Sequence, residues 1–111
     1  MFIKEEREMK LHNVSVDLKS NTYFEGRVTS RNVKFSDGSL KTLGVMLEGE
    51  YEFNTAKKEI MEITSGEMQV LLPGSTEWQT FTENTFFDVP ANSSFKVKII
   101  KITNYCCSYI D

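Results

Sequence analysis

Histidine is almost missing from this chain of 111 residues: His12 is the only one, and it lies close to the N-terminus. Nucleophilic triads and dyads need an imidazole beside the serine or cysteine. Transition-metal sites built from imidazoles need two or three of them. The sequence therefore excludes these classes of enzyme and predicts a protein that holds no metal ion and no other cofactor.

Cysteine and glycine motifs are also scarce. The two cysteines, Cys106 and Cys107, are neighbours whose side chains diverge in an extended chain, so we expect no disulfide between them. We interpret both as small apolar residues of a strand. There is no Cys-x-x-Cys pair, and the glycines form neither a P-loop nor a Gly-x-Gly-x-x-Gly fingerprint, which excludes the common redox and nucleotide-phosphate motifs.

Long apolar runs and an excess of basic charge are missing too. No stretch approaches the roughly 20 apolar residues that a membrane-spanning helix needs, and the first residues are too charged for a signal peptide. The 13 basic and 16 acidic side chains are interspersed and give a net charge of −3, whereas binding to nucleic-acid phosphates requires a basic stripe. We expect a soluble, cytoplasmic protein with neither a membrane nor a nucleic acid as partner.

The sequence is rich in β-strand patterning. From Tyr23 onward, short runs of Val, Ile, Phe, Tyr and Thr alternate in polarity, and turn residues recur about every eight to twelve positions, as in all-β sandwiches and barrels. We expect one all-β domain of about eight strands over residues 19–111, with little or no helix, preceded by a tail or extra edge strand over residues 1–18. The turn signals are Asp37-Gly38, Glu48-Gly49, Ser65-Gly66, Pro73-Gly74, Glu83-Asn84 and Pro90-Ala91-Asn92.

Strand alternation predicts which side chains face inward. Residues 59–64 and 67–72 alternate in polarity on either side of Ser65-Gly66, which predicts a hairpin there. In the first run Met61 and Ile63 form the more apolar face, so Glu59 is expected to point into the interior with them. Burial of a carboxylate costs free energy unless the group is paired or hydrogen-bonded, so an inward carboxylate is expected to have a structural or functional role. In the last two expected strands the inward residues are Phe95, Val97 and Ile99, and then Tyr105, Cys107 and Tyr109.

The spacing of several residues follows the two motifs of cupin barrels, which in the general case carry metal-binding histidines. Glu59 lies seven residues before Gly66, as the cupin glutamate does. Phe95, which follows Pro90, stands at the usual histidine position of the second motif, and residues 50–54 occupy the place of the His-x-His pair with acids and aromatics. The spacing predicts a cupin-type β-barrel, an RmlC-like jelly roll, without a metal site.

Two acidic residues are candidates for a functional site. Glu59 is either a strand-end carboxylate that hydrogen-bonds backbone amides or a tyrosine, or a pocket carboxylate with a raised pKa that holds sugar hydroxyls or assists proton transfer. Glu48, Glu50 and Glu52 share one strand face, which favours a solvated position for Glu48 and Glu52. Glu50 stays a second candidate because a bulge at Gly49 would redirect it.

Aromatic residues allow two interpretations. Tyr51, Phe53, Phe87 and Phe95 form either ordinary barrel core or a wall on which a flat base stacks. Trp78 follows a turn and has polar neighbours, so it is either a rim or interface residue or a plug in the core.

Several short motifs, taken together, resemble the pyrimidine/purine nucleoside phosphorylase family of small cupin-fold proteins. The similarity runs from about Ser20 to Ile110 and leaves residues 1–18 outside. Any one motif is commonplace, but their joint spacing over nearly the whole chain is specific. The motifs are Asn21-x-Tyr23-Phe24-x-Gly26-x-Val28, Gly44-Val45-Met46-x-x-Gly49-Glu50-Tyr51-x-Phe53, Glu59-x-Met61, Ser65-Gly66 with Val70-Leu71-Leu72-Pro73, Trp78-Gln79, Phe87-x-Val89-Pro90 and Tyr105-x-Cys107.

The resemblance implies a homodimeric cupin that cleaves purine and pyrimidine nucleosides with inorganic phosphate, giving the free base and pentose 1-phosphate. Glu59, with Glu50 as second choice, would then hold the ribose hydroxyls, while Tyr51 and Phe53 or Phe87 would stack on the base. Met61 and Phe95 would complete the wall of the substrate site. The candidates for holding phosphate are the nearest basic residues, Arg27, Arg31, Lys34 and Lys41.

Two other functions stay open at this point. The chain could be a metal-free cupin that binds a small sugar or nucleoside without turning it over, or a purely structural dimer. Phosphate-dependent release of a free base distinguishes the enzyme from both.

Overall fold

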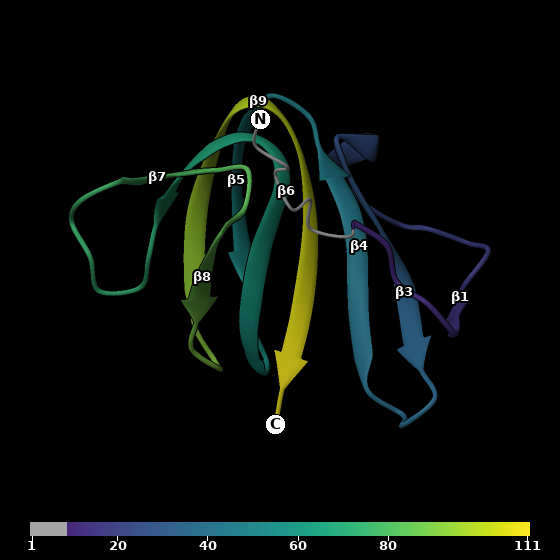
Figure 1. Cartoon of the computed structure of the whole chain (residues 1–111). Helices are drawn as coiled ribbons and strands as arrows, with labels where there is room; N and C mark the ends of the chain where they lie inside the picture. The colour runs from purple at the N-terminus through teal and green to yellow at the C-terminus, as the bar shows by residue number, and fades with distance from the viewer. Residues whose placement is uncertain (1–8) are drawn as a thin grey trace, which may run out of the picture.

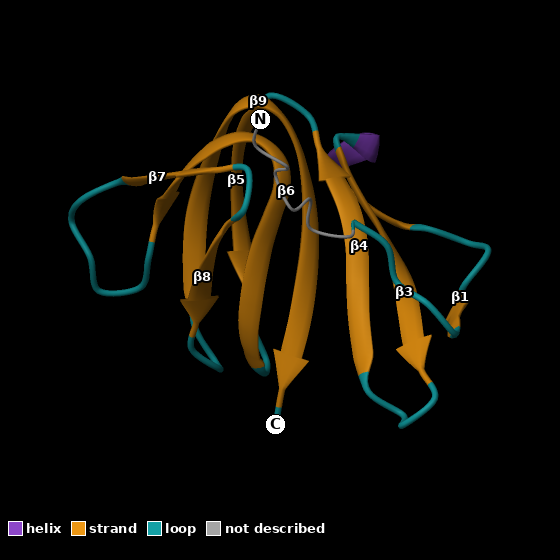
Figure 2. Ribbon diagram, in the orientation of Figure 1, coloured by secondary structure: helices purple, strands orange, loops and turns teal. Residues whose placement is uncertain are grey.

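The computed structural model describes residues 9–111 and consists almost entirely of β-strands (Figure 2). No described helix is long and apolar enough to cross a membrane. The all-β prediction is confirmed. The elements are β1 (Val14–Val16), β2 (Asn21–Tyr23), the 3-10 turn η1 (Phe24–Gly26), β3 (Val28–Phe35), β4 (Leu40–Met46), β5 (Gly49–Asn54), β6 (Lys58–Leu71), β7 (Gln79–Thr82), β8 (Thr85–Val89) and β9 (Ser94–Ile110).

Two long strands organise the sheet: β6 has 14 residues and β9 has 17. β9 pairs with β5 through its first half and with β4 through its second half. β6 pairs with β8 through its first half and with β7 through its second half, and it pairs with β9 along most of its length. Both long strands arch from one layer to the other, so one antiparallel sheet rolls into a two-layered barrel (Figure 1).

The core lies between the two layers and contains the side chains that strand alternation assigns to the interior. Met61, Ile63, Phe95, Val97 and Ile99 are all buried. Tyr105 and Cys107 are buried as well, whereas Tyr109, near the end of β9, stays 38% exposed. The predicted inward faces of these strands are therefore confirmed, with Tyr109 at the edge of the interior.

Neither Cys106 nor Cys107 forms a disulfide, and both are buried. Cys107 points inward, as expected. Cys106 has the opposite orientation in the strand, and it lines a groove on the outer face of the sheet together with Met9 and Leu11. The interpretation of both cysteines as small buried strand residues is confirmed.

The predicted hairpin at Ser65-Gly66 is wrong. These residues lie inside β6, where the register against β9 shifts between Ile63 and Met68. Gly66 has φ +102°, and a Cβ at this position would lie 2.7 Å from the Cα of Thr103 on β9. The glycine therefore allows a bulge at the bend where β6 passes from one layer to the other, and not a chain reversal.

The last two expected strands are likewise one continuous strand, β9, which bends opposite the bulge of β6. At the N-terminus, β1 pairs with β3 and adds a short edge strand to the sheet. Residues 1–8 of the predicted tail lie outside the described residues.

Candidate functional site

A cavity of about 160 Å³ lies inside the barrel. Hydroxyl groups from β2, β3, β4 and β9 line it, together with apolar side chains from β3, β4, β5, β6 and β9. Glu59, from the first half of β6, contributes a carboxylate. The lining residues are Tyr23, Val28, Ser30, Thr42, Met46, Phe53, Asn54, Glu59, Met61, Phe95, Tyr105, Cys107 and Tyr109.

Glu59 is half-buried in this cavity. Its Oε1 accepts a hydrogen bond from the thiol of Cys107 at 3.5 Å, and Tyr109 stands opposite Glu59 on the neighbouring strand. Burial raises the pKa of the Glu59 carboxyl, and the hydrogen bond from Cys107 partly opposes this effect. The described geometry thus combines features of both interpretations of Glu59, because the carboxylate is held by a local partner and also faces a cavity.

The groups around Glu59 are neutral hydrogen-bonding groups. Burial raises the pKa of Tyr105, of Cys107 and of Tyr109 well above the ordinary values. The hydroxyl of Tyr109 lies 3.1 Å from Oγ1 of Thr42, and that of Tyr105 donates to the carbonyl of Thr29 at 3.3 Å. These groups keep their protons at neutral pH. Cys107 and Tyr105 already donate theirs to Glu59 and to the carbonyl of Thr29, which leaves the pair of Tyr109 and Thr42 to donate a hydrogen bond to a polar ligand.

Tyr105 reaches this position because Gly44 faces it on β4. The two residues are direct partners in the sheet, and a Cβ on Gly44 would lie 2.5 Å from Cζ and from the hydroxyl of Tyr105. A side chain at position 44 would thus displace the ring from the cavity wall. An isolated glycine within a strand signals such a close approach, although it does not identify the partner.

The aromatic candidates separate into core and cavity wall. Tyr51 and Phe87 are buried in the core and do not line the cavity, whereas Phe53 and Phe95 do. The Phe53 and Phe95 rings lie 5.6 Å apart between centroids. Met61 also lines the cavity. The stacking wall expected from the sequence is thus reduced to Phe53 and Phe95.

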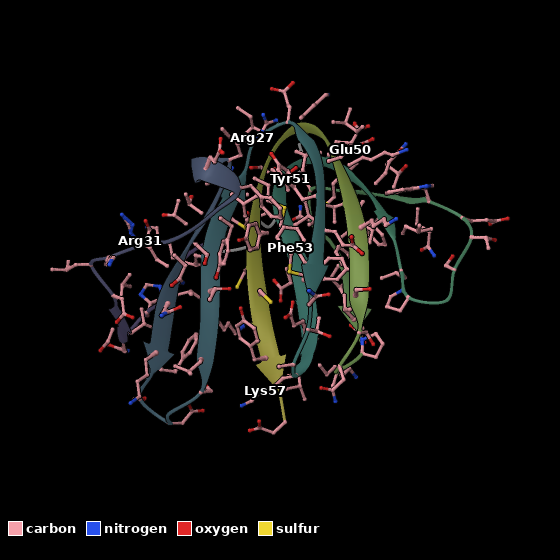
Figure 3. All side chains as sticks on the ribbon, turned by 180° about the vertical axis from the view of Figure 1, so that it is seen from behind. Arg27, Arg31, Glu50, Tyr51, Phe53 and Lys57 are labelled. Carbon is pink, nitrogen blue, oxygen red and sulfur yellow. The ribbon has the colours of Figure 1, made fainter. Side chains whose placement is uncertain are left out.

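Glu50 is placed away from the cavity. Alternation on β5 turns Tyr51 and Phe53 inward and leaves Glu50 and Glu52 exposed on the outer side, and Figure 3 shows Glu50 at the upper edge of the molecule. In the sheet Glu50 stands opposite Lys98. The structure therefore does not bring the two acidic candidates, Glu50 and Glu59, together.

The basic candidates lie in different places (Figure 3). Arg27, between η1 and β3, donates from Nε to the Tyr51 hydroxyl at 3.3 Å and from Nη2 to the carbonyl of Glu48 at 2.6 Å. Lys41 and Arg31 line the groove of about 820 Å³ on the outer face of the sheet. Lys41 therefore lies on the opposite face from Glu59, since its neighbour Thr42 is the residue that points into the cavity.

No group of three or more His, Cys, Asp or Glu side chains within residues 9–111 is arranged to hold a metal ion. At the position of the second cupin histidine, the ring of Phe95 forms part of the cavity wall. Trp78 is half-buried outside the core, with Nζ of Lys98 4.2 Å from its ring centroid. Of the two interpretations of Trp78, the structure favours the rim residue.

Several cavity residues were missed from the sequence. Ser30 and Thr42 are buried hydroxyl residues of β3 and β4, and Asn54 and Tyr23 end short strands. The available signal was alternation, because Ser30 shares a strand face with Val28, and Thr42 shares one with Met46. That signal shows which residues face inward and does not show where the core leaves a cavity.

Comparison with known proteins shows the family directly. The profile of the pyrimidine/purine nucleoside phosphorylase family matches residues 18–109. A protein of that name from Sulfurovum sp. (strain NBC37-1) is 58% identical over 101 residues, which cover 91% of this chain and 98% of that protein. Another from Chlorobium chlorochromatii (strain CaD3) is 56% identical over 98 residues, covering 88% and 94%.

Solved structures agree with the fold. A protein of unknown function from Acinetobacter sp. ADP1 superposes with a TM-score of 0.89 at 41% identity, covering 91% of this chain and 98% of that chain. A cupin superfamily protein from Desulfitobacterium hafniense DCB-2 shares the fold alone, with a TM-score of 0.62 at 14% identity over 85% and 84% of the two chains. The predicted cupin barrel is confirmed, and the chain belongs to the pyrimidine/purine nucleoside phosphorylase family.

Proposed function

We propose that this protein is a pentosyltransferase that cleaves purine and pyrimidine nucleosides with inorganic phosphate as co-substrate. In this reaction the bond between C1′ and the base nitrogen breaks, and its electron pair leaves with the base. A phosphate oxygen forms the new bond to C1′, which gives pentose 1-phosphate, and the proton that the hydrogen phosphate loses goes to the departing base. The names of the two curated relatives support this choice of reaction.

The observation that carries the proposal is a half-buried carboxylate in a cavity that is lined by both hydroxyl groups and apolar side chains. Cleavage at C1′ passes through an oxocarbenium-like transition state, whose positive charge a nearby carboxylate stabilises. Glu59 would supply this charge. Tyr109 and Thr42 share one hydrogen bond, so one of the two hydroxyls would donate to an oxygen of the pentose and the other would accept from a pentose hydroxyl. The cavity has the mixed lining that a sugar bearing an apolar ring face requires.

Arg27 is the residue that we propose for phosphate. Two of its hydrogen bonds are made to Tyr51 and Glu48, which fix the guanidinium and leave its other N–H donors available. The Tyr51 ring packs against Phe53, with centroids 6.3 Å apart, and Phe53 lines the cavity. Lys41 and Arg31 are less suitable because they line the outer groove.

No step in this scheme uses a metal ion or another cofactor.

We also infer that the protein is a homodimer and that it lies in the cytoplasm. Cys106 and Cys107 form no disulfide, which suits a reducing compartment. Fractionation of cells that express the protein would contradict this location if the chain appeared outside the cytoplasm.

A second function, binding of a small sugar or nucleoside without turnover, is favoured by one observation. Among the described residues that line the cavity, none is a lysine or an arginine. Phosphate would therefore have to bind at the rim. Nucleoside binding without release of base in the presence of phosphate would favour this alternative over the enzyme.

Chromatography of mixed nucleosides, incubated with the purified protein in chelator-containing buffer with and without phosphate, tests the reaction. We expect free base only when phosphate is present. Glu59→Gln should lower kcat by about 100-fold or more, because it removes the charge and keeps the shape, while the exposed Glu52→Gln keeps the parent rate. Arg27→Ala should raise KM for phosphate about tenfold, and the groove variant Arg31→Ala should not.

Three results would contradict these predictions. No base release by the parent with any nucleoside would remove the enzyme function. An unchanged rate for Glu59→Gln would leave Glu59 with a structural role only, and loss of all activity on chelation would contradict a cofactor-free reaction.

A further inference from the structure

The turn η1 holds three successive residues in the left-handed region: φ is +51° at Phe24, +57° at Glu25 and +88° at Gly26. Only the last is a glycine. A bulky aromatic residue with positive φ is a genuine outlier, and such conformations persist where surrounding contacts impose them, often at ligand sites. The backbone N–H of Arg27 closes the turn onto the carbonyl of Phe24 at 3.1 Å.

The contacts that hold Phe24 are aromatic. Its ring centroid lies 5.0 Å from that of Tyr51 and 5.6 Å from that of Phe53, in tilted and edge-to-face arrangements. Despite these contacts the residue is 43% exposed. The strained turn therefore presents part of an aromatic ring to solvent instead of burying it.

This exposed ring stands at the rim of the cavity. Phe53, which Phe24 contacts, lines the cavity, and so does Tyr23, the residue before Phe24 in the chain. The cavity of about 160 Å³ is well below the roughly 300 Å³ at which pockets for drug-sized ligands begin. It has room for one ring of a nucleoside, and the second ring must lie at the rim.

The hydroxyl and carboxylate groups in the cavity determine whether the pentose or the base of the nucleoside occupies it. Glu59, Tyr109 and Thr42 suit the hydroxyls of a pentose, so the base is the ring left at the rim. A base outside the cavity meets the exposed aromatic ring of Phe24. Stacking accepts any base because every base has a π face.

We propose that Phe24 is a substrate-binding residue on whose exposed ring the base of the nucleoside stacks while the pentose occupies the cavity beside Glu59. This inference rests on the proposed function and extends it to the selection of substrates. Purines and pyrimidines are accepted alike because the site recognises the sugar inside the barrel and only stacks on the base.

Isothermal titration calorimetry with adenosine and with uridine, in the absence of phosphate, tests the proposal independently of turnover. Phe24→Ala should weaken binding of both nucleosides by roughly tenfold, within the range that loss of one stacked base covers. Phe24→Trp keeps an aromatic surface and should restore most of the affinity. The matched control is Phe86→Ala, which removes a 64% exposed ring from β8 and should leave both affinities unchanged.

Kinetics in the synthetic direction separate a stacking role from a structural one. With the free base and pentose 1-phosphate as substrates, Phe24→Ala should raise KM for the base about tenfold and leave KM for pentose 1-phosphate unchanged. A structural defect would raise both constants. Equal nucleoside affinities of Phe24→Ala and the parent, or equal increases in both KM values, would overturn the role of Phe24.

The experiments distinguish a failure of the proposed phosphorylase function from a failure of the proposed role of Phe24. The phosphorylase function fails if the parent binds nucleosides but releases no base when phosphate is added, and in that case the calorimetric comparison of Phe24→Ala with Phe86→Ala still decides whether Phe24 binds the base. A parent that binds no nucleoside overturns both proposals.

Discussion

The ionisation of Glu59, in the candidate site, affects the stability of the folded protein. Its pKa is raised first by burial, with the hydrogen bond from Cys107 acting in the opposite direction. A carboxyl whose pKa is higher in the folded state than in the unfolded state favours folding while it is protonated. That contribution is complete below the unfolded pKa and is lost as the pH rises through the folded pKa.

We therefore expect Glu59→Gln to gain stability over the parent protein as the pH rises. The two proteins should differ least near pH 4, and the difference should grow by up to about 1 kcal/mol toward pH 7, since a half-buried group is partly screened by solvent. Urea denaturation at a series of pH values measures this. A difference in free energy of unfolding that stays constant with pH would show that solvent relieves the burial of Glu59.

For single residues, alternation along the strands was enough to predict that Glu59 faces inward, because side chains two positions apart share one face of a strand. It could not find the close contact of Gly44 with Tyr105, which joins residues of β4 and β9 that lie 61 positions apart in the chain. It also could not anticipate Phe24, whose backbone conformation contradicts the usual preference of an aromatic residue.

Among the elements, β6 and β9 depart most from the expected pattern, since each was predicted to be two strands and is one bent strand. The Ser65-Gly66 signal was correctly located, but it marks a bulge. A glycine with positive φ suits a hairpin and a bulge equally. The partner strand decides between them, because β9 continues alongside β6 past the bend.

Gly66→Ala tests the role of this bulge. The new methyl group would be forced against Thr103 at the bend, in addition to the strain of positive φ, so we expect a loss of about 2 kcal/mol or more. Gly74→Ala is the matched control: Gly74 has φ +76°, but a Cβ there meets no atom within 4 Å, so only about 1 kcal/mol should be lost. Urea denaturation gives both values, and equal losses would contradict close packing at the bend.

For the whole molecule, the exposed edges of the rolled sheet are the feature that bears on assembly. Among the described residues, β1, β2, β5, β7 and β8 each pair along one side only. Unpaired edges favour association, and a closed dimer covers them without open-ended growth. We expect sedimentation equilibrium to give twice the chain mass of 12.8 kDa. A mass of 12.8 kDa at all concentrations would contradict the homodimer.

The sequence by itself determined the all-β class, the inward faces of the strands and the lack of an imidazole set, because these follow from local periodicity and from composition. It also contained the motifs that place the chain in its family. Only the tertiary structure decided that Glu59 shares a cavity with Tyr109 and Thr42, and that Lys41 and Glu50 do not. These relations depend on how β4, β6 and β9 roll together, and the contacts between distant strands that fix this roll leave no regular pattern along the chain.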